Sequence, residues 1–213
     1  MKNTILKITV LLVVLAFLPE DAVAQQLSIY NQNIANPFSI NPSAAGIEGN
    51  KIFLHHRKQW VGIDGAPEFS MLTSEWRLGT SRTGIGLSLS SDRSGVIQNT
   101  GAAITYASHF NLTKTQTLSF GISAGVKQNS IAFGDVNSFD EQDVVLFSQD
   151  QNSSHFDFNA GLTYKVGNLT AQVAGLQLLG NSSTYNNSFV GKQIDFQHVR
   201  HYFGSLGYDF VTK

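Results

Sequence analysis

The chain contains no cysteine, and this absence excludes a disulfide framework as well as any thiolate metal or redox site. Charged residues make up only 14% of the sequence, and its 14 lysines and arginines are matched by 15 acidic residues. No basic excess is left to hold a phosphate backbone, so nucleic acid is not an expected partner. No apolar run approaches the roughly 20 residues that a membrane-spanning helix needs. The sequence therefore excludes a helical membrane protein.

The N-terminus has the layout of a cleaved secretory signal. Lys2 and Lys7 precede an apolar run over residues 8–18, and the small residues of Ala22-Val23-Ala24 stand directly before Gln25. The pattern predicts a signal peptide over residues 1–24 and a mature chain that begins at Gln25. We therefore expect an exported protein.

The clearest strand signal lies between Thr117 and Gln128, where apolar residues alternate without a break against small or polar ones. The same alternation appears in residues 84–90 and 156–165. Successive side chains of a strand point to opposite faces, so each segment has one apolar and one polar or small face. After an export signal, this pattern indicates an outer-membrane β-barrel with lipid outside and water inside.

Eight strands are predicted along the mature chain. Their ranges are residues 51–59, 68–77, 84–91, 100–110, 116–128, 156–166, 169–178 and 199–210. The connections between them alternate between long and short, with 92–99 among the long ones and Gly167-Asn168 as a tight turn. Outer-membrane barrels have long extracellular loops and short periplasmic turns, so this alternation places residues 25–50 and the chain end on the periplasmic side.

Two further features concern loops and barrel width. Residues 129–155 and 179–198 are rich in Asn, Ser, Gln and Asp, which predicts solvated loops. The expected inward faces carry small residues such as Gly84, Gly121 and Gly161. An eight-stranded barrel must fill its interior with side chains, so small residues favour a wider barrel of which these strands are a part.

Two motifs carry a family resemblance. Tyr30-Asn31-Gln32, Asn36-Pro37 and the run Ile40-Asn41-Pro42-Ser43-Ala44-Ala45-Gly46 precede the first predicted strand, and Arg57-Lys58-Gln59-Trp60-Val61-Gly62-Ile63-Asp64-Gly65-Ala66-Pro67 follows it. In order and spacing they resemble the PorP/SprF family of type IX secretion system membrane proteins from Bacteroidetes. Members of that family continue through further strands, so the chain resembles the front part of a longer barrel.

The resemblance implies an all-β, antiparallel transmembrane barrel with three regions: a signal peptide at 1–24, a periplasmic arm at 25–50 and an outer-membrane barrel at 51–213. The implied function is that of a non-enzymatic component of the secretion and gliding machinery, which supports export or surface attachment of cargo proteins. The implied partners are outer-membrane lipid, periplasmic and peptidoglycan-associated machine proteins, and a secreted adhesin or cargo protein. The candidate partner-binding residues are Asn36, Pro37, Asn41, Pro42, Arg57, Gln59, Trp60, Gly62, Gly65 and Pro67.

The prolines of the arm disfavour helical geometry in the residues before them, which predicts a stiff, non-helical segment that plugs the barrel or docks on a partner.

The sequence Gly121-Ile122-Ser123-Ala124-Gly125 matches the G-x-S-x-G motif of hydrolases. The nucleophilic serine of that motif needs a strained turn between a strand and a helix, whereas Ser123 lies inside a regular predicted strand. No catalytic, cofactor-binding or metal-binding residues are predicted.

Two alternative functions remain open at this point. A passive porin-like channel would account for the polar inward face, although few inward charges are present to select ions. A soluble, secreted β-sandwich that acts as a binding module could share the same composition.

Overall fold

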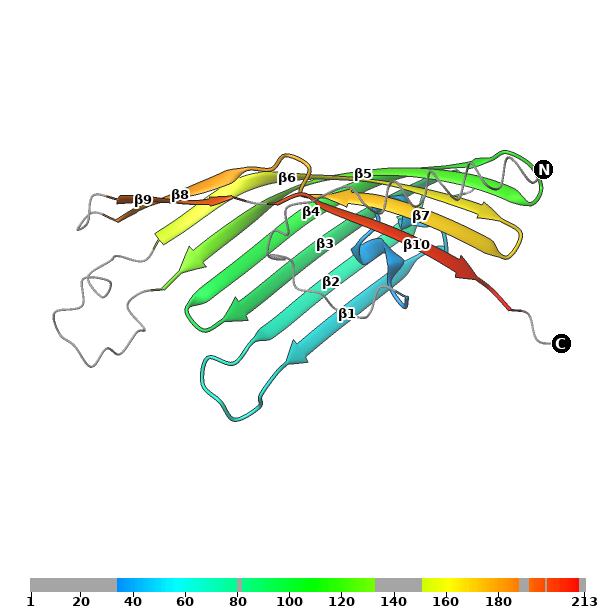
Figure 1. Cartoon of the computed structure of the whole chain (residues 1–213). Helices are drawn as coiled ribbons and strands as arrows, with labels where there is room; N and C mark the ends of the chain where they lie inside the picture. The colour runs from blue at the N-terminus through cyan, green and yellow to red at the C-terminus, as the bar shows by residue number, and fades with distance from the viewer. Residues whose placement is uncertain (1–33, 80–81, 133–150, 188–191, 198, 211–213) are drawn as a thin grey trace, which may run out of the picture.

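The computed structural model describes residues 34–79, 82–132, 151–187, 192–197 and 199–210, without the side chains of residues 151, 182–187 and 192–197. The predicted signal peptide and residues 133–150 lie outside these ranges. Eight strands form one antiparallel sheet (Figure 1). They are β1 (Lys51–Lys58), β2 (Glu68–Arg77), β3 (Thr83–Ser94), β4 (Ile97–Asn111), β5 (Gln116–Ile131), β6 (Gln151–Val166), β7 (Leu169–Leu176) and β10 (His201–Tyr208).

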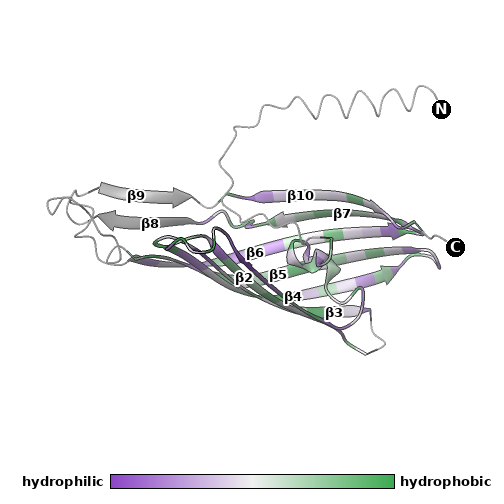
Figure 2. Ribbon diagram, turned by 90° about the horizontal axis from the view of Figure 1, so that it is seen from below, coloured by the Kyte–Doolittle hydropathy of each residue, from purple (hydrophilic) through white to green (hydrophobic). Residues whose placement is uncertain are grey.

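The sheet is curved into a half-barrel, and its strands follow chain order except that β10 is added next to β7 (Figure 1). Within the described residues, β1 pairs only with β2 and β10 pairs only with β7, so both outer edges of the sheet are open. The predicted antiparallel β-barrel architecture is confirmed at this level. A β-sandwich would place a second sheet against the first, whereas here the concave face is covered by residues 36–46, seen inside the curve of the sheet in Figure 2.

All eight predicted strands are present, and β2 has the predicted bounds. The middle strands extend further than predicted, and the expected long connection at 92–99 is wrong. Only Gly95 and Val96 separate β3 from β4, and Gly95 has a φ of 57° that suits glycine in a tight turn. The strict alternation of long and short connections therefore fails at this position.

The physical reason for this error is a loss of alternation toward one end of the strands. Beyond Leu89, both faces of β3 are polar, as in Ser90, Ser91 and Asp92, so the two-residue period of hydrophobicity disappears. The same holds for the ends of β5 and β6, which occupy residues 129–131 and 151–155 of a predicted loop.

A second correction concerns the predicted loop at 179–198. Most of it forms a two-stranded antiparallel hairpin of β8 (Ser182–Asn187) and β9 (Lys192–Gln197), which lies beside β6 (Figure 1). Polar residues dominate this segment, and the brief alternation of Ile194 and Phe196 is too short to predict a strand.

The two faces of the main sheet differ as predicted. Apolar residues of β3, β5 and β6, among them Leu87, Phe120 and Phe156, point outward, while Gly86, Gly121 and Asp157 point inward. The small buried apolar cluster lies on the concave side and consists of Phe38, Ala44, Ala45 and Ala107. None of the helices in the described residues is both long and apolar enough to cross a membrane.

Candidate functional site

The arm, of which the structure describes residues 34–50, lies against the concave face of the sheet. It contains two 3₁₀ turns, η2 (Pro37–Ser39) and η3 (Pro42–Ala44), so the expectation of a wholly non-helical arm is corrected. Each turn starts with a proline that follows an asparagine. Proline suits the first helical position because its φ is fixed and it lacks an N–H group, while the residue before it is held extended. The Asn-Pro pairs therefore set two bends in the arm.

Asn41 is the most connected residue of the arm. Its side chain caps η3, because Oδ1 accepts hydrogen bonds from Ser43 N (3.0 Å) and Ser43 Oγ (2.7 Å). Its Nδ2 donates to Thr163 Oγ1 on β6 (3.1 Å) and to Gln172 Oε1 on β7 (3.3 Å). Asn41 is only 1% exposed, so each of these bonds replaces one that water would otherwise make.

Two further buried contacts fix the arm on either side of Asn41. Asn36 Nδ2 donates to Thr73 Oγ1 of β2 (2.8 Å). On β4, His109 Nε2 donates to the carbonyl oxygen of Ala45 (3.0 Å), and its Nδ1 lies 2.9 Å from Ser119 Oγ on β5. The arm is thus bound through side chains from four strands of the sheet, β2, β4, β6 and β7.

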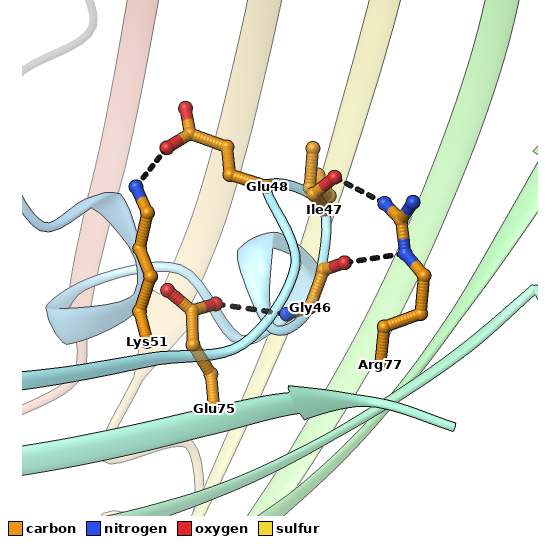
Figure 3. Close-up of polar contacts among 6 residues, drawn as sticks. All are labelled: Gly46, Ile47, Glu48, Lys51, Glu75 and Arg77. Atoms are coloured by element: carbon orange, nitrogen blue, oxygen red, sulfur yellow. Dashed lines mark hydrogen bonds and ion pairs between the residues drawn. The ribbon is translucent and has the colours of Figure 1, made fainter. Parts of the chain in front are cut away.

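The end of the arm is clamped by a pair of charged residues on β2 (Figure 3). The amide of Gly46 donates to Glu75 Oε2 (2.8 Å), and Arg77 Nε donates to the carbonyl oxygen of Gly46 (2.8 Å). Arg77 also donates to the carbonyl oxygen of Ile47 through Nη2. Both backbone groups of Gly46, its N–H and its carbonyl, are therefore hydrogen-bonded to side chains of β2.

Four inward-facing glycines provide the space in which the arm lies. A Cβ atom added at any of them would collide with the arm. The nearest arm atoms would be Ala45 O at 2.0 Å from Gly84, the Phe38 ring at 2.3 Å from Gly86, Pro42 C at 2.3 Å from Gly121 and Asn41 Oδ1 at 2.0 Å from Gly161. The small inward residues thus have a cause other than barrel width, because they form the seat of the arm.

The second group of predicted residues lies in the hairpin between β1 and β2. Arg57 ends the inward row of β1, and Gln59 N donates to Pro67 O (2.9 Å) to close the loop. Trp60 has a φ of 48°, in the left-handed region that non-glycine residues rarely adopt, and Gly62 and Gly65 have φ values of 97° and 73°. The two glycines are needed for this backbone path.

The structure does not bring the two groups together. Asn36 bonds Thr73 in the middle of β2 and Asn41 bonds Thr163 and Gln172 on β6 and β7, whereas the hairpin joins β2 at Glu68. At about 3.4 Å per residue, Thr73 and Glu68 are roughly 17 Å apart along this strand. In the first group all but Pro37 are buried, whereas no residue of the second group is buried and Trp60, Gly62 and Gly65 are exposed. Sequence reasoning missed Thr73, Glu75, Arg77, His109, Thr163 and Gln172, whose common signal is a polar side chain at an inward position.

The convex face changes from apolar to polar along one register row of the sheet. The last apolar row consists of Leu54, Leu72, Leu89, Ala102, Val126 and Phe156. The first polar row consists of His56, Ser70, Ser91, Thr100, Gln128 and Ser154, and the second of Lys58, Glu68, Arg93, Gln98, Ser130 and Asn152. On the apolar side of this boundary, many of the outward side chains are exposed in the isolated chain, including Ile104, Phe120, Val173 and Leu206.

A half-barrel of antiparallel strands, apolar outside and filled from inside by its own N-terminal arm, is a β-barrel-like wall. The family model described as type IX secretion system membrane protein PorP/SprF matches residues 22–213, and the chain belongs to this family. It is thereby a component of a type IX secretion system, and the family is one of secretion membrane proteins, not known as an enzyme family. Comparison with curated proteins gave no match, and comparison with solved structures gave none either.

Proposed function

We propose that the protein is a non-enzymatic outer-membrane component of the type IX secretion and gliding machinery, which supports the export or surface attachment of cargo proteins. In this proposal residues 1–24 are a signal peptide that is removed on export, residues 25–50 are an arm that enters from the periplasm, and residues 51–213 form the barrel wall. Family membership supports the assignment to the type IX secretion machinery. The apolar convex face supports the assignment to the outer membrane.

The apolar part of the convex face has the height that an outer membrane requires. On β6 the outward residues are apolar from Phe156 to Val166. At about 3.4 Å per residue this is roughly 34 Å along the strand, and roughly 25 Å across a membrane for a strand tilted by about 40°. Outer-membrane barrels carry an apolar band of about this height. This agreement is the observation that carries the proposal.

The orientation follows from the connections. The turns at 112–115 and 167–168 lie at the same end of the sheet as residues 34–50 and the end of β10, while the hairpin at 59–67 and the connection from β5 to β6 lie at the opposite end. The turns at 112–115 and 167–168 are assigned to the periplasm together with the arm, and the longer connections to the cell surface, where the two-residue turn at 95–96 also lies.

The exposed hairpin is the better partner-binding candidate of the two motif groups. In the seated arm, Asn36 and Asn41 are 5% and 1% exposed, so a partner could reach these side chains only after the arm leaves the concave face. Trp60 needs no such rearrangement. Contact with periplasmic machine proteins would then involve parts of the arm outside its seat.

The membrane assignment is tested by fractionating cells that make the native-length protein, followed by gel electrophoresis with and without boiling. We expect the protein in the outer-membrane fraction, with a band that shifts on boiling because a barrel resists detergent until heated. A protein that stays in the aqueous fraction would overturn the proposal in favour of a soluble binding module. Loss of cargo at the cell surface in a deletion strain tests the secretion assignment separately.

A passive channel is the second candidate, and one observation favours it. A cavity of about 820 Å³ remains beside the arm and is lined by Ile40 and Ile47 on one side and by polar residues such as Thr170, Gln172 and Ser205 on the other. Single-channel conductance of the inserted protein separates the two functions. Steady conductance together with normal cargo export in the deletion strain would indicate a channel.

A further inference from the structure

The hairpin between β1 and β2 exposes three large apolar side chains close together. Trp60 is 67% exposed, Val61 82% and Ile63 61%. We call these three residues the apolar tip. Surface apolar residues are common when scattered singly, whereas neighbouring exposed apolar side chains rimmed by polar residues are typical of protein or membrane interaction sites.

The apolar tip is held by a defined backbone. Two successive turns are closed by hydrogen bonds from Ile63 N to Trp60 O (3.1 Å) and from Ala66 N to Ile63 O (3.3 Å). Gly95 N, in the turn between β3 and β4, donates to Gly65 O (2.8 Å) and ties the loop to its neighbour. The left-handed φ of Trp60 adds strain that a purely connecting loop has no need to retain. A loop ordered before binding loses little entropy on binding.

A polar belt separates the apolar tip from the apolar band of the convex face. His56, Lys58, Glu68 and Ser70 point outward between the two, and Glu68 lies 3.8 Å from both His56 Nε2 and Lys58 Nζ. From Leu54 to Lys58, the last residue of β1, the chain rises roughly 14 Å along the strand, which at a tilt of about 40° is roughly 10 Å along the membrane normal, and the tip follows beyond Lys58. The tip therefore lies beyond the hydrocarbon layer.

We propose that the apolar tip docks into an apolar pocket on a secreted protein at the cell surface. This inference rests on the proposed function, because that function places the hairpin on the outside of the cell. Acyl chains are the other apolar partner available, but the ion-paired belt would have to enter the hydrocarbon before the tip could reach it, at a large desolvation cost. Trp60 acts as the anchor, since buried tryptophans carry a large share of binding energy in protein interfaces.

The surroundings of the tip are tested by fluorescence of the protein in lipid nanodiscs. Because the chain has two tryptophans, Trp76→Phe leaves Trp60 as the single emitter, and Trp60→Phe leaves Trp76, which lies on the apolar convex face. Trp60 emission should be quenched by acrylamide and not by brominated lipid, and Trp76 emission should show the reverse. Quenching of Trp60 by brominated lipid would overturn the docking proposal, because it would show a lipid anchor.

The protein partner is tested in cells by the amount of cargo retained at the surface. The variant Trp60→Ala/Val61→Ser/Ile63→Ser should lower this amount on the order of tenfold, as expected for loss of an interface hot spot, while barrel levels and the heat-dependent gel shift stay normal. Leu112→Ser is the matched control, because Leu112 is an exposed apolar loop residue (54%) at the opposite end of the sheet. Normal cargo retention in the triple variant would overturn the proposal. If a deletion strain also retained its cargo, the proposed function itself would fail.

Discussion

The arm and the β1–β2 hairpin have similar compositions and opposite environments. Both combine glycine or proline with polar residues, and both carry motifs that resemble the same family. The arm buries its motif on the concave face, where side chains from four strands bond it, whereas the hairpin exposes its apolar residues at the end of the sheet. The comparison teaches that a family motif alone does not reveal its role. A buried motif stabilises the fold of its own chain, whereas an exposed motif is available to bind another molecule.

The largest effect is expected from filling the seat. Gly161→Val should displace Asn41 and lower the free energy of unfolding by about 3 kcal/mol or more, because overpacking against backbone and buried polar atoms cannot relax easily. Urea titration of the protein in detergent micelles measures this change. Gly204→Val is the matched control on β10, since a Cβ there meets no atom within 4 Å and should leave stability nearly unchanged. Equal stability of the two variants would show that the arm does not occupy its seat.

A smaller effect is expected from removing the polar anchor without filling space. Asn41→Ala deletes two bonds to Ser43 and two to the sheet, and it leaves the buried Thr163 and the partly buried Gln172 with fewer partners. At about 1 kcal/mol per net hydrogen bond, the loss should be about 2–3 kcal/mol after relaxation. The same urea titration measures it, with Asn99→Ala on the exposed part of β4 as the control. A loss no larger than that of the control would mean that Asn41 contributes only to local turn geometry.

In the hairpin, the backbone should matter more for stability than the exposed side chains. Gly62→Ala has open space around the added methyl group but places it at a φ of 97°, which should cost about 1–2 kcal/mol locally. Hydrogen exchange at the amides of Ile63 and Ala66 would report the loosened loop, while exchange within β4 and β5 should be unchanged. Altered exchange throughout the sheet would contradict a local role.

The smallest effect on stability is expected from the apolar tip itself. Trp60→Ala should change the free energy of unfolding by less than about 0.5 kcal/mol, because the side chain is mostly exposed and packs little in the isolated chain. Its effect on cargo attachment should nevertheless be large. A thermal scan in micelles compared with the cell-surface assay separates the two, and a marked loss of stability would assign Trp60 to the fold.

The sequence was most informative where one face of a strand is apolar. In β5 the unbroken alternation from Leu118 to Val126 predicted the strand and both of its faces. Where polar residues dominate the sequence, as in residues 92–99 and in the hairpin of β8 and β9, the alternation is absent or too short, and these strand segments were missed. Local pattern carries no information about such segments, because pairing with a neighbour determines their structure.

The seat of the arm could not be predicted for a different reason. The glycines were recognised as inward and small, but their partners are far away in the chain: Asn41 and Thr163 are 122 residues apart. Nothing in a single sequence connects such positions. The hairpin motif, by contrast, is local, and its glycines at 62 and 65 have the positive φ values of a tight backbone path.

The seat also imposes an order of events on assembly. The arm is synthesised before any strand of the sheet, yet two of its anchoring residues, Thr163 and Gln172, belong to β6 and β7 near the other end of the chain. The arm can therefore reach its final position only after most of the wall has formed around it. Contacts of such long sequence separation form late and slowly. The arm in its seat therefore indicates that the strands β6 and β7 have already formed. An assembly factor that binds only the seated arm would thus recognise only barrel walls that are complete up to β7.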